Sequence, residues 1–465
     1  MAGAEVPPVS AQVEIPVETW LTSLDRKLQD SLPPSSNWRI CRVPRKLQSV
    51  KKDAYSPQVI SIGPFHHAAD NVKPMAHHKL HYATSLLSRT PATKSTATLA
   101  ACADFLRRFD STIRAYYAEK IDLNQTQLAE VLIVDSLFII ELFVRYFNVD
   151  LRLQHDPIFT SSWMILTLQR DLLLLENQIP FFVLEMLFMI TVKRSAIGPS
   201  MPPLPELALL FFKSALNLDE KSSPIGGSTT WSCHHLLDLT YKSYFCPSPR
   251  LNLREESSRD LERLAAPDLV RGRGERGKKK KEKPWVLIQS AKELKTVGIK
   301  FRKVTAKHLF EMEFNDGKFR IPPLTVHDST DSLLRNLMAY EQFSHASRQF
   351  VTSYVMLMDR LIDTKEDVQI LEKAGVIENE LGDSGYVSNL FNEMCKQIVF
   401  REFYYDGLCE QVNGYSKGRW QKSKAHFKSV YLKNIWTIVS LFVAAWVLAA
   451  TTIQTVYSIL DYNKP

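Results

Sequence analysis

Five histidines near the N-terminus carry the side chains best suited to metal binding or proton transfer: His66, His67, His77, His78 and His81. On a helix, His77 and His81 would share one face, a spacing at which two imidazoles bind one metal ion. Neither an acidic third ligand nor an H-E-x-x-H pattern accompanies the pair. The pattern is more typical of histidines that hydrogen-bond a loop, so we predict no metal and no other cofactor.

Two glycine-containing motifs are similar to loops of phosphate-binding or catalytic sites. Residues 272–277 read G-x-G-x-x-G, but this motif binds phosphate only between a strand and a helix. No β-branched run precedes it, and a lysine run follows. Residues 382–385 read GDSG, like the nucleophile loop of trypsin-like proteases, which also needs a histidine base, a carboxylate and a β-barrel. Neither context is present, so we predict no catalytic residue and no enzyme.

A basic run in the second half of the chain is a candidate partner surface. Its cationic residues are Arg271, Arg273, Arg276, Lys278, Lys279, Lys280 and Lys281. Such runs attract nucleic acid, acidic proteins or anionic lipids. No aromatic residues interleave with the basic ones, so bases would have no stacking platform. We predict a solvated charged loop that meets an unknown protein partner, and we do not expect nucleic-acid binding.

The composition is that of a globular protein with a sizeable core. Of the 465 residues 45% are hydrophobic, and the net charge is +8, which is mild. The six cysteines are scattered without C-x-x-C spacing, which predicts reduced thiols in a cytosolic setting. The first thirty residues contain acidic side chains and no continuous apolar run, so a signal peptide is not expected.

The last apolar stretch, residues 434–460, contains no charged residue. As a helix it would be roughly 40 Å long, against about 30 Å of bilayer hydrocarbon. Lysines and arginines on its N-terminal side place the preceding body in the cytosol by the positive-inside rule. We predict a single-pass protein of the plasma membrane or an endomembrane. Ala445 and Ala449 form a candidate face for homo-oligomerisation through the span.

The elements that must position these residues are mainly helical. The apolar stretches 131–147 and 171–188 contain charged residues, so both are interpreted as soluble core helices. Pro180 breaks the second stretch and is predicted at the first position of a new helix. Alternating apolar residues around the Asn315–Gly317 turn predict a β-hairpin. Thr364 is predicted to be the N-cap of a helix, and Gly375 is predicted to end that helix.

The predicted fold class is therefore mainly α, with a small antiparallel β element and one C-terminal transmembrane helix. The domain boundaries are as follows: an amphipathic leading segment 1–34, a helical N-terminal lobe 35–246, a basic insertion 247–284, a C-terminal lobe 285–433, the span 434–460 and a tail 461–465.

Several stretches resemble one plant family, domain-of-unknown-function family 247, also called the UPF0481 type. They include CRVPRKL, AYSPQVISIGPFHH, DLLLLENQIPFFVLEMLF, GKFRIPPLTV and DVQILEKAGVIENELG. The positions that match the family pattern are Arg42, Pro44, Tyr55, Pro57, Gly63, Pro64, His66, His67, His78, Glu176, Asn177, Gln178 and Pro180. The family histidine corresponds to His78, which argues further against a metal at His77 and His81.

The resemblance implies a protein without established enzymatic chemistry. Some grass members are implicated in self-incompatibility, so it implies a membrane-anchored protein that acts by protein–protein recognition or signalling. The alternative is an enzyme with a polar site around Tyr55, His66, His67, His78 and Asp135.

Overall fold

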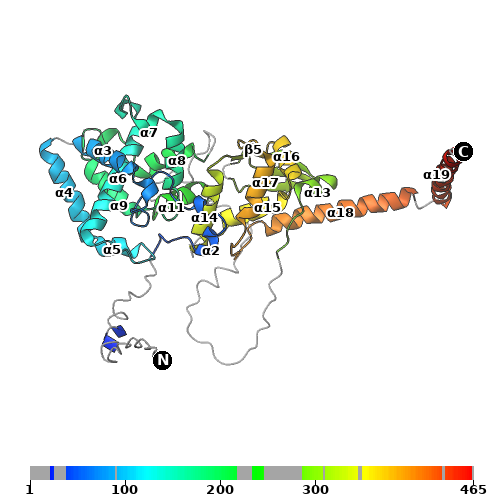
Figure 1. Cartoon of the computed structure of the whole chain (residues 1–465), viewed down its shortest axis with the longest axis horizontal. Helices are drawn as coiled ribbons and strands as arrows, with labels where there is room; N and C mark the ends of the chain where they lie inside the picture. Colours follow the sequence, from blue (N-terminus) through cyan, green and yellow to red (C-terminus); the bar gives the residue numbers. More distant parts are fainter. Residues whose placement is uncertain are drawn as a thin grey trace, which may run out of the picture.

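The computed structural model describes residues 21–22, 24–25, 38–89, 92–216, 233–245, 285–306, 309–343, 348–431 and 435–462. The basic run at 271–281, the G-x-G-x-x-G motif and most of the leading segment 1–34 lie outside these ranges. Figure 1 shows the described helices in two halves that lie side by side.

The N-terminal half is built around one long helix, α6 (Gln125–Phe147). Its middle is apolar enough to be buried all round, and a capping box between Asn124 and Gln127 fixes its start. Helices α3, α4, α9 and α10 pack against it. The elements of this half are α2 (Arg45–Gln48), η1 (Lys52–Ala54), η2 (Asp70–Val72), α3 (Met75–Ser88), α4 (Ala92–Arg108), α5 (Asp110–Ala115), η3 (Val149–Leu151), α7 (Pro157–Thr160), α8 (Ser162–Leu172), α9 (Phe181–Thr191), η4 (Gly198–Ser200), α10 (Leu204–Lys213), α11 (Leu236–Thr240) and the π-helical turn η5 (Tyr241–Phe245).

The C-terminal half combines helices with two small sheets. Its helices are α13 (Ala291–Thr296), α14 (Thr330–Phe343), α15 (Phe350–Leu361), α16 (Lys365–Lys373), α17 (Ser384–Met394) and α18 (Asp406–Tyr431). One sheet has the order β1-β3-β2, and the other pairs β4 with β5. The strands are β1 (Lys300–Lys303), β2 (Glu313–Asn315), β3 (Lys318–Ile321), β4 (Leu324–Val326) and β5 (Ile377–Asn379).

The predicted hairpin is confirmed as the antiparallel pair β2–β3. Asp316 and Gly317 form its two-residue turn with φ of 52° and 73°, the positive values that a tight hairpin turn requires. The parallel pairs β1–β3 and β4–β5 were not predicted. The two strands of a parallel pair are separated by a crossover segment, so a local alternation pattern cannot predict which strands pair.

Buried side chains from both halves form one continuous core that runs from Ile40 to Val412. The halves meet where α14 lies against the η1 segment. Ser332 Oγ and Asn336 Nδ2 both donate to the carbonyl oxygen of Ala54, at 2.6 and 2.9 Å. The backbone N–H of Leu175 donates to Oδ1 of Asn336 at 2.9 Å, so one amide side chain of α14 holds two loops of the N-terminal half.

The structure also shows two predicted helix boundaries and the state of the cysteines. The Thr364 N-cap is confirmed, with a capping box to Asp367, and Gly375 follows the helix with φ +70°. Helix α9 begins at Phe181 with Pro180 as its N-cap, one residue later than predicted, because Pro180 has non-helical backbone angles (φ −54°, ψ 128°). Five cysteines are described, all unpaired: Cys41, Cys102, Cys233, Cys395 and Cys409.

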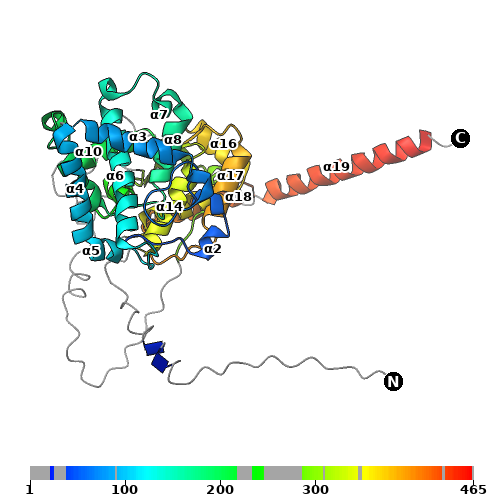
Figure 2. The ribbon, with the colours of Figure 1, turned by 60° about the vertical axis from the view of Figure 1, so that its left-hand side comes forward.

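Two long helices end the described chain: α18, which projects from the body (Figure 1), and α19 (Ile435–Tyr462), which extends away from it in Figure 2. Among the described residues, no helix is both long and apolar enough to cross a bilayer. The predicted transmembrane helix over 434–460 and the single-pass membrane location are therefore wrong. Homo-oligomerisation through Ala445 and Ala449 stays a prediction. The prediction relied on the absence of charge, but a charge-free run is not uniformly apolar. Thr451, Thr452 and Thr455 place hydroxyl groups along α19.

Candidate functional site

The signature residues 176–178 lie in the loop between α8 and α9, and all three side chains are buried. The carboxylate of Glu176 accepts hydrogen bonds from the backbone N–H of Val43 at 2.7 Å and from Nε2 of Gln48 at 2.9 Å. Nη1 of Arg42 lies 3.5 Å and Nε2 of His66 lies 3.0 Å from its other oxygen. The His66 contact does not have hydrogen-bond geometry, and Nε2 has no hydrogen-bond partner among the described residues. Glu176 therefore ties the α2 segment to this loop.

Asn177 and Gln178 bond to main chain. Oδ1 of Asn177 accepts from the N–H of Ile62 at 2.6 Å, and its Nδ2 donates to the carbonyl of Ile60 at 3.0 Å. Nε2 of Gln178 donates to the carbonyl of Leu172 at 2.8 Å. Both amides replace backbone partners that an extended loop lacks.

A further carboxylate, Asp171, holds the same extended segment. Its oxygens accept from the backbone N–H groups of Gln58, Val59 and Ile60 at 2.9, 2.7 and 3.0 Å. Nη1 of Arg170 lies 2.6 Å away. Burial raises the pKa of Asp171, while these donors favour its ionised form. Because Asp171 and Asn177 bond consecutive parts of residues 58–62, we call this arrangement the loop clamp.

Gly63 completes the loop clamp. Its φ is +71°, and a Cβ there would lie 2.6 Å from the carbonyl oxygen of Gln178. Its N–H donates to Oδ2 of Asp135 at 2.9 Å, and Nζ of Lys79 lies 2.6 Å from the other oxygen. Lys79 also donates to the carbonyl oxygen of Ser61. Burial raises the pKa of Asp135, against the opposing effect of the Lys79 ammonium group.

The side chains of the alternative enzyme site turn to different partners. Tyr55 interacts with Arg335, and Asp135 pairs with Lys79. Nε2 of His66 lies beside the carboxylate of Glu176, and Nδ1 of His67 contacts the carbonyl oxygen of Pro64. The ring of His78 lies against that of His77. The signature prolines are structural as well: Pro44 and Pro180 are N-caps of α2 and α9, and the carbonyl of Pro57 accepts from Nδ2 of Asn71.

Arg42 is a signature residue whose side chain is open to solvent. Its guanidinium lies 4.5 Å from the ring centre of Phe65 and 2.9 Å from the carboxylate of Glu119. With its side chain 41% exposed, these contacts contribute little stability.

The GDSG quartet is also structural, because Asp383 caps α17 by accepting from the N–H of Gly385.

A second buried network was missed from the sequence. Arg145, fully buried, contacts Glu141 at 2.7 Å and Asp156 at 2.6 Å. Arg89 pairs with the same Glu141, and Tyr82 donates to Asp156 at 2.7 Å. The signal was present, since charged residues interrupt the apolar run 131–147. Glu141 and Arg145 pair with each other on α6, but Arg89, Asp156 and Tyr82 come from other segments.

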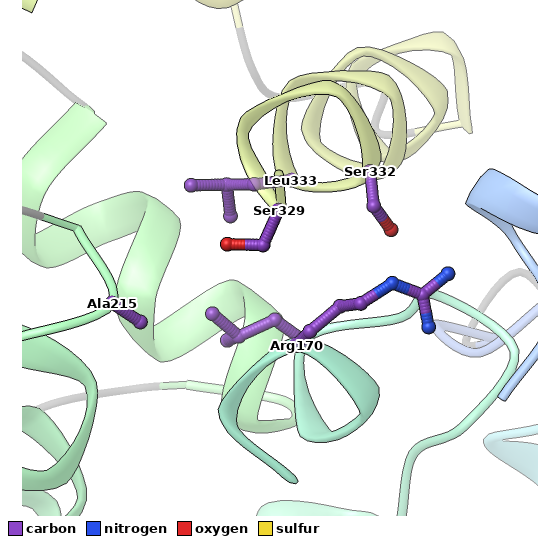
Figure 3. Close-up of a pocket in the computed structure, with 6 residues that line it drawn as sticks. Arg170, Ala215, Ser329, Ser332 and Leu333 are labelled. Atoms are coloured by element: carbon purple, nitrogen blue, oxygen red, sulfur yellow. The ribbon is translucent and has the colours of Figure 1, made fainter. Parts of the chain in front are cut away.

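A hollow between α8 and the start of α14 is lined by Arg170, Leu173, Ala215, Ser329, Ser332 and Leu333 (Figure 3). Its volume of about 10 Å³ holds no more than a water molecule, whereas ligand pockets measure about 300–1,000 Å³. Within the described chain, no group of three or more histidine, cysteine or acidic side chains is placed to hold a metal ion.

The fold and the loop clamp define a mainly helical scaffold whose signature polar residues hold its own backbone. A family model described as plant protein of unknown function, DUF247, matches residues 40–450. The chain belongs to this family, as the resemblance predicted. UPF0481 protein At3g47200 of Arabidopsis thaliana is 30% identical over 430 residues, which cover 91% of this chain and 86% of that protein. Putative UPF0481 protein At3g02645 of Arabidopsis thaliana is 24% identical over 506 residues, covering 93% and 92%. No solved structure matches the chain.

Proposed function

We propose that this protein acts by recognising another protein and does not catalyse a reaction. The loop clamp supports this proposal, because its carboxylates and amides bond to main chain or to fixed cations. Side chains engaged in this way are poor candidates for a nucleophile or a mobile acid–base group.

A partly exposed apolar face, formed where the end of α4 meets α9, carries the proposal. Phe105 lies with ring centres 4.8 Å from Phe109 and 6.3 Å from Phe182. Met186 and Met189 continue this face along α9 and are 41% and 52% exposed. We call these five residues the α4/α9 face. Methionine and aromatic side chains in solvent are typical of surfaces that adapt to a protein partner.

The test is cross-linking mass spectrometry in plant tissue that expresses the full chain. We expect cross-links from the α4/α9 face to a partner protein, lost in the double variant Phe109→Asp/Met186→Asp. The control is Trp163→Asp/Leu166→Asp on α8, where both residues are also exposed apolar side chains. Retention of every cross-linked protein by a folded Phe109→Asp/Met186→Asp variant would contradict the proposal.

The nature of the partner would decide the finer role. Recovery of a protein from the pollen–stigma interface would support a role in self-incompatibility. Recovery of a signalling protein from other tissue would support a different recognition pathway. Both roles stay predictions of the family resemblance.

A further inference from the structure

The three-stranded sheet β1-β3-β2 presents a cationic face to solvent. In the parallel pair, Lys300 stands opposite Lys318 and Arg302 stands opposite Arg320. Lys300, Arg302 and Lys318 are exposed, and Arg320 is partly exposed. We call these four residues the cationic sheet face.

Charge compensation on this face is incomplete. Nη1 of Arg320 lies 3.5 Å from Oε2 of Glu313, which stands opposite it in β2. Lys300, Arg302 and Lys318 make no ion pair with any side chain within the described ranges. Like charges placed directly opposite one another in a sheet destabilise it. An anionic partner would relieve this repulsion.

The opposite face of the sheet makes the cationic face rigid. Phe301, Phe314 and Phe319 are buried and touch ring to ring, with centres about 6 Å apart. Tyr415 of α18 packs on Phe314 at 5.5 Å. The cations therefore project from strands whose positions are fixed by an aromatic core, which lowers the entropy cost of binding.

The spacing of the cations matches an extended polypeptide. Same-face residues along a strand repeat every 6.6 Å or so, and neighbouring strands lie about 4.8 Å apart. A partner segment with acidic residues at alternate positions has the same repeat, so its carboxylates meet successive cations in step. The aromatic residues of the sheet point inward, so the exposed side offers no ring on which a nucleic-acid base could stack.

We propose that the cationic sheet face binds an extended segment of a partner protein that carries acidic residues at alternate positions. This inference rests on the proposed recognition function and adds to the α4/α9 face a second surface, with the chemistry of the partner segment that it binds. It assigns the binding to the described sheet and does not involve the basic run at 271–281.

The first experiment measures fluorescence anisotropy of a labelled peptide of alternating glutamate and threonine, titrated with the full-length protein. A peptide of alternating glutamine and threonine is the matched probe. We expect binding of the glutamate peptide alone, weakened about tenfold or more in Arg302→Glu/Lys318→Glu. Weakening should stay within about twofold in Lys46→Glu/Lys120→Glu, which changes the net charge equally on the other half.

Several outcomes would overturn the inference. Equal weakening in both double variants would show an effect of net charge alone, and equal binding of the two peptides would exclude charge recognition. Tighter binding of a single-stranded RNA oligonucleotide, or of mixed phosphatidylserine and phosphatidylcholine vesicles, through the same residues would assign the face to another partner class. The neutral variant Arg302→Gln/Lys318→Gln, with an unchanged melting curve, excludes unfolding as the cause of lost binding.

The cross-linking experiment separates this inference from the proposed function. If Arg302→Glu/Lys318→Glu retains every partner that the wild type recovers, the sheet face is not the binding surface and the recognition function stands. If the wild type recovers no partner, the recognition function itself fails.

Discussion

At the scale of single residues, Gly63 shows why packing fixes a signature position. A side chain there meets two obstacles, a left-handed backbone and the carbonyl oxygen of Gln178 2.6 Å from the Cβ position. Gly382 has a similar φ of +82° but no atom within 4 Å of its Cβ position. The two glycines therefore separate backbone strain from steric overlap.

We expect Gly63→Ala to lower the free energy of unfolding by about 3–5 kcal/mol, the sum of backbone strain and overpacking. Gly382→Ala should cost only about 1–2 kcal/mol, from the backbone alone. Urea denaturation followed by circular dichroism measures both. Equal losses in the two variants would mean that the Gln178 carbonyl moves away freely and that the loop clamp is soft.

At the scale of elements, Glu341 joins three helical segments. Its carboxylate, on α14, accepts from the N–H groups of Val351 and Thr352 at the start of α15, both at 2.8 Å. The hydroxyl of Tyr241, in the π-helical turn, donates to it at 2.9 Å. Burial raises the pKa of Glu341 to about 7 although these donors oppose the shift.

This shift predicts a pH dependence of stability. Between pH 4.5 and about 7 the folded state holds a proton that the unfolded chain releases, so the stabilisation present below pH 4.5 is lost as pH rises through 7. The total change is about 3 kcal/mol, at about 1.4 kcal/mol per pKa unit. The denaturation midpoints of the wild type and of Glu341→Gln are measured from pH 4 to 8. Their difference at each pH gives the contribution of Glu341 to stability.

The comparison with Glu341→Gln is necessary because another buried group acts in the opposite direction. Burial lowers the pKa of His235 to about 4, so its contribution is lost as pH falls below 6.5 and approaches 4. The difference between wild type and variant cancels that contribution. A constant difference across the whole range would show that Glu341 keeps one protonation state.

At the scale of the whole molecule, the two halves share one core, and Asn336 on α14 links the C-terminal half to the N-terminal half. It receives a hydrogen bond from Leu175 and donates one to Ala54, both in the N-terminal half. Replacing it leaves a buried N–H and a buried carbonyl with fewer partners.

We expect Asn336→Ala to lower stability by about 2–4 kcal/mol and to weaken the coupling between the halves. Hydrogen exchange in denaturant, read on α6 and α15, should show one common opening free energy in the wild type and two in the variant. Asn392→Ala, which removes a bond to the carbonyl of Asp363 within the C-terminal half, is the control. Unequal opening already in the wild type would contradict a cooperative molecule.

Local patterns determined much of the secondary structure from the sequence alone. The helical class, the Asp316–Gly317 hairpin turn and the Thr364 cap depend on residues within a few positions of one another, where backbone preference and side-chain capping act directly. The family pattern included Gly63 and Asn177 of the loop clamp, but it did not single out Asp171. The span predicted at 434–460 was wrong, because a long charge-free helix is not by that alone apolar enough to cross a bilayer.

Tertiary structure alone decided what the signature residues do. Asp171 and Asn177 bond to backbone more than 100 positions away, and the halves meet through Asn336, which is more distant still. The cationic sheet face exists only because β1 and β3 pair in parallel and in register. A linear pattern specifies which groups are polar, but the partner of each polar group depends on chain segments that only the folded core brings together.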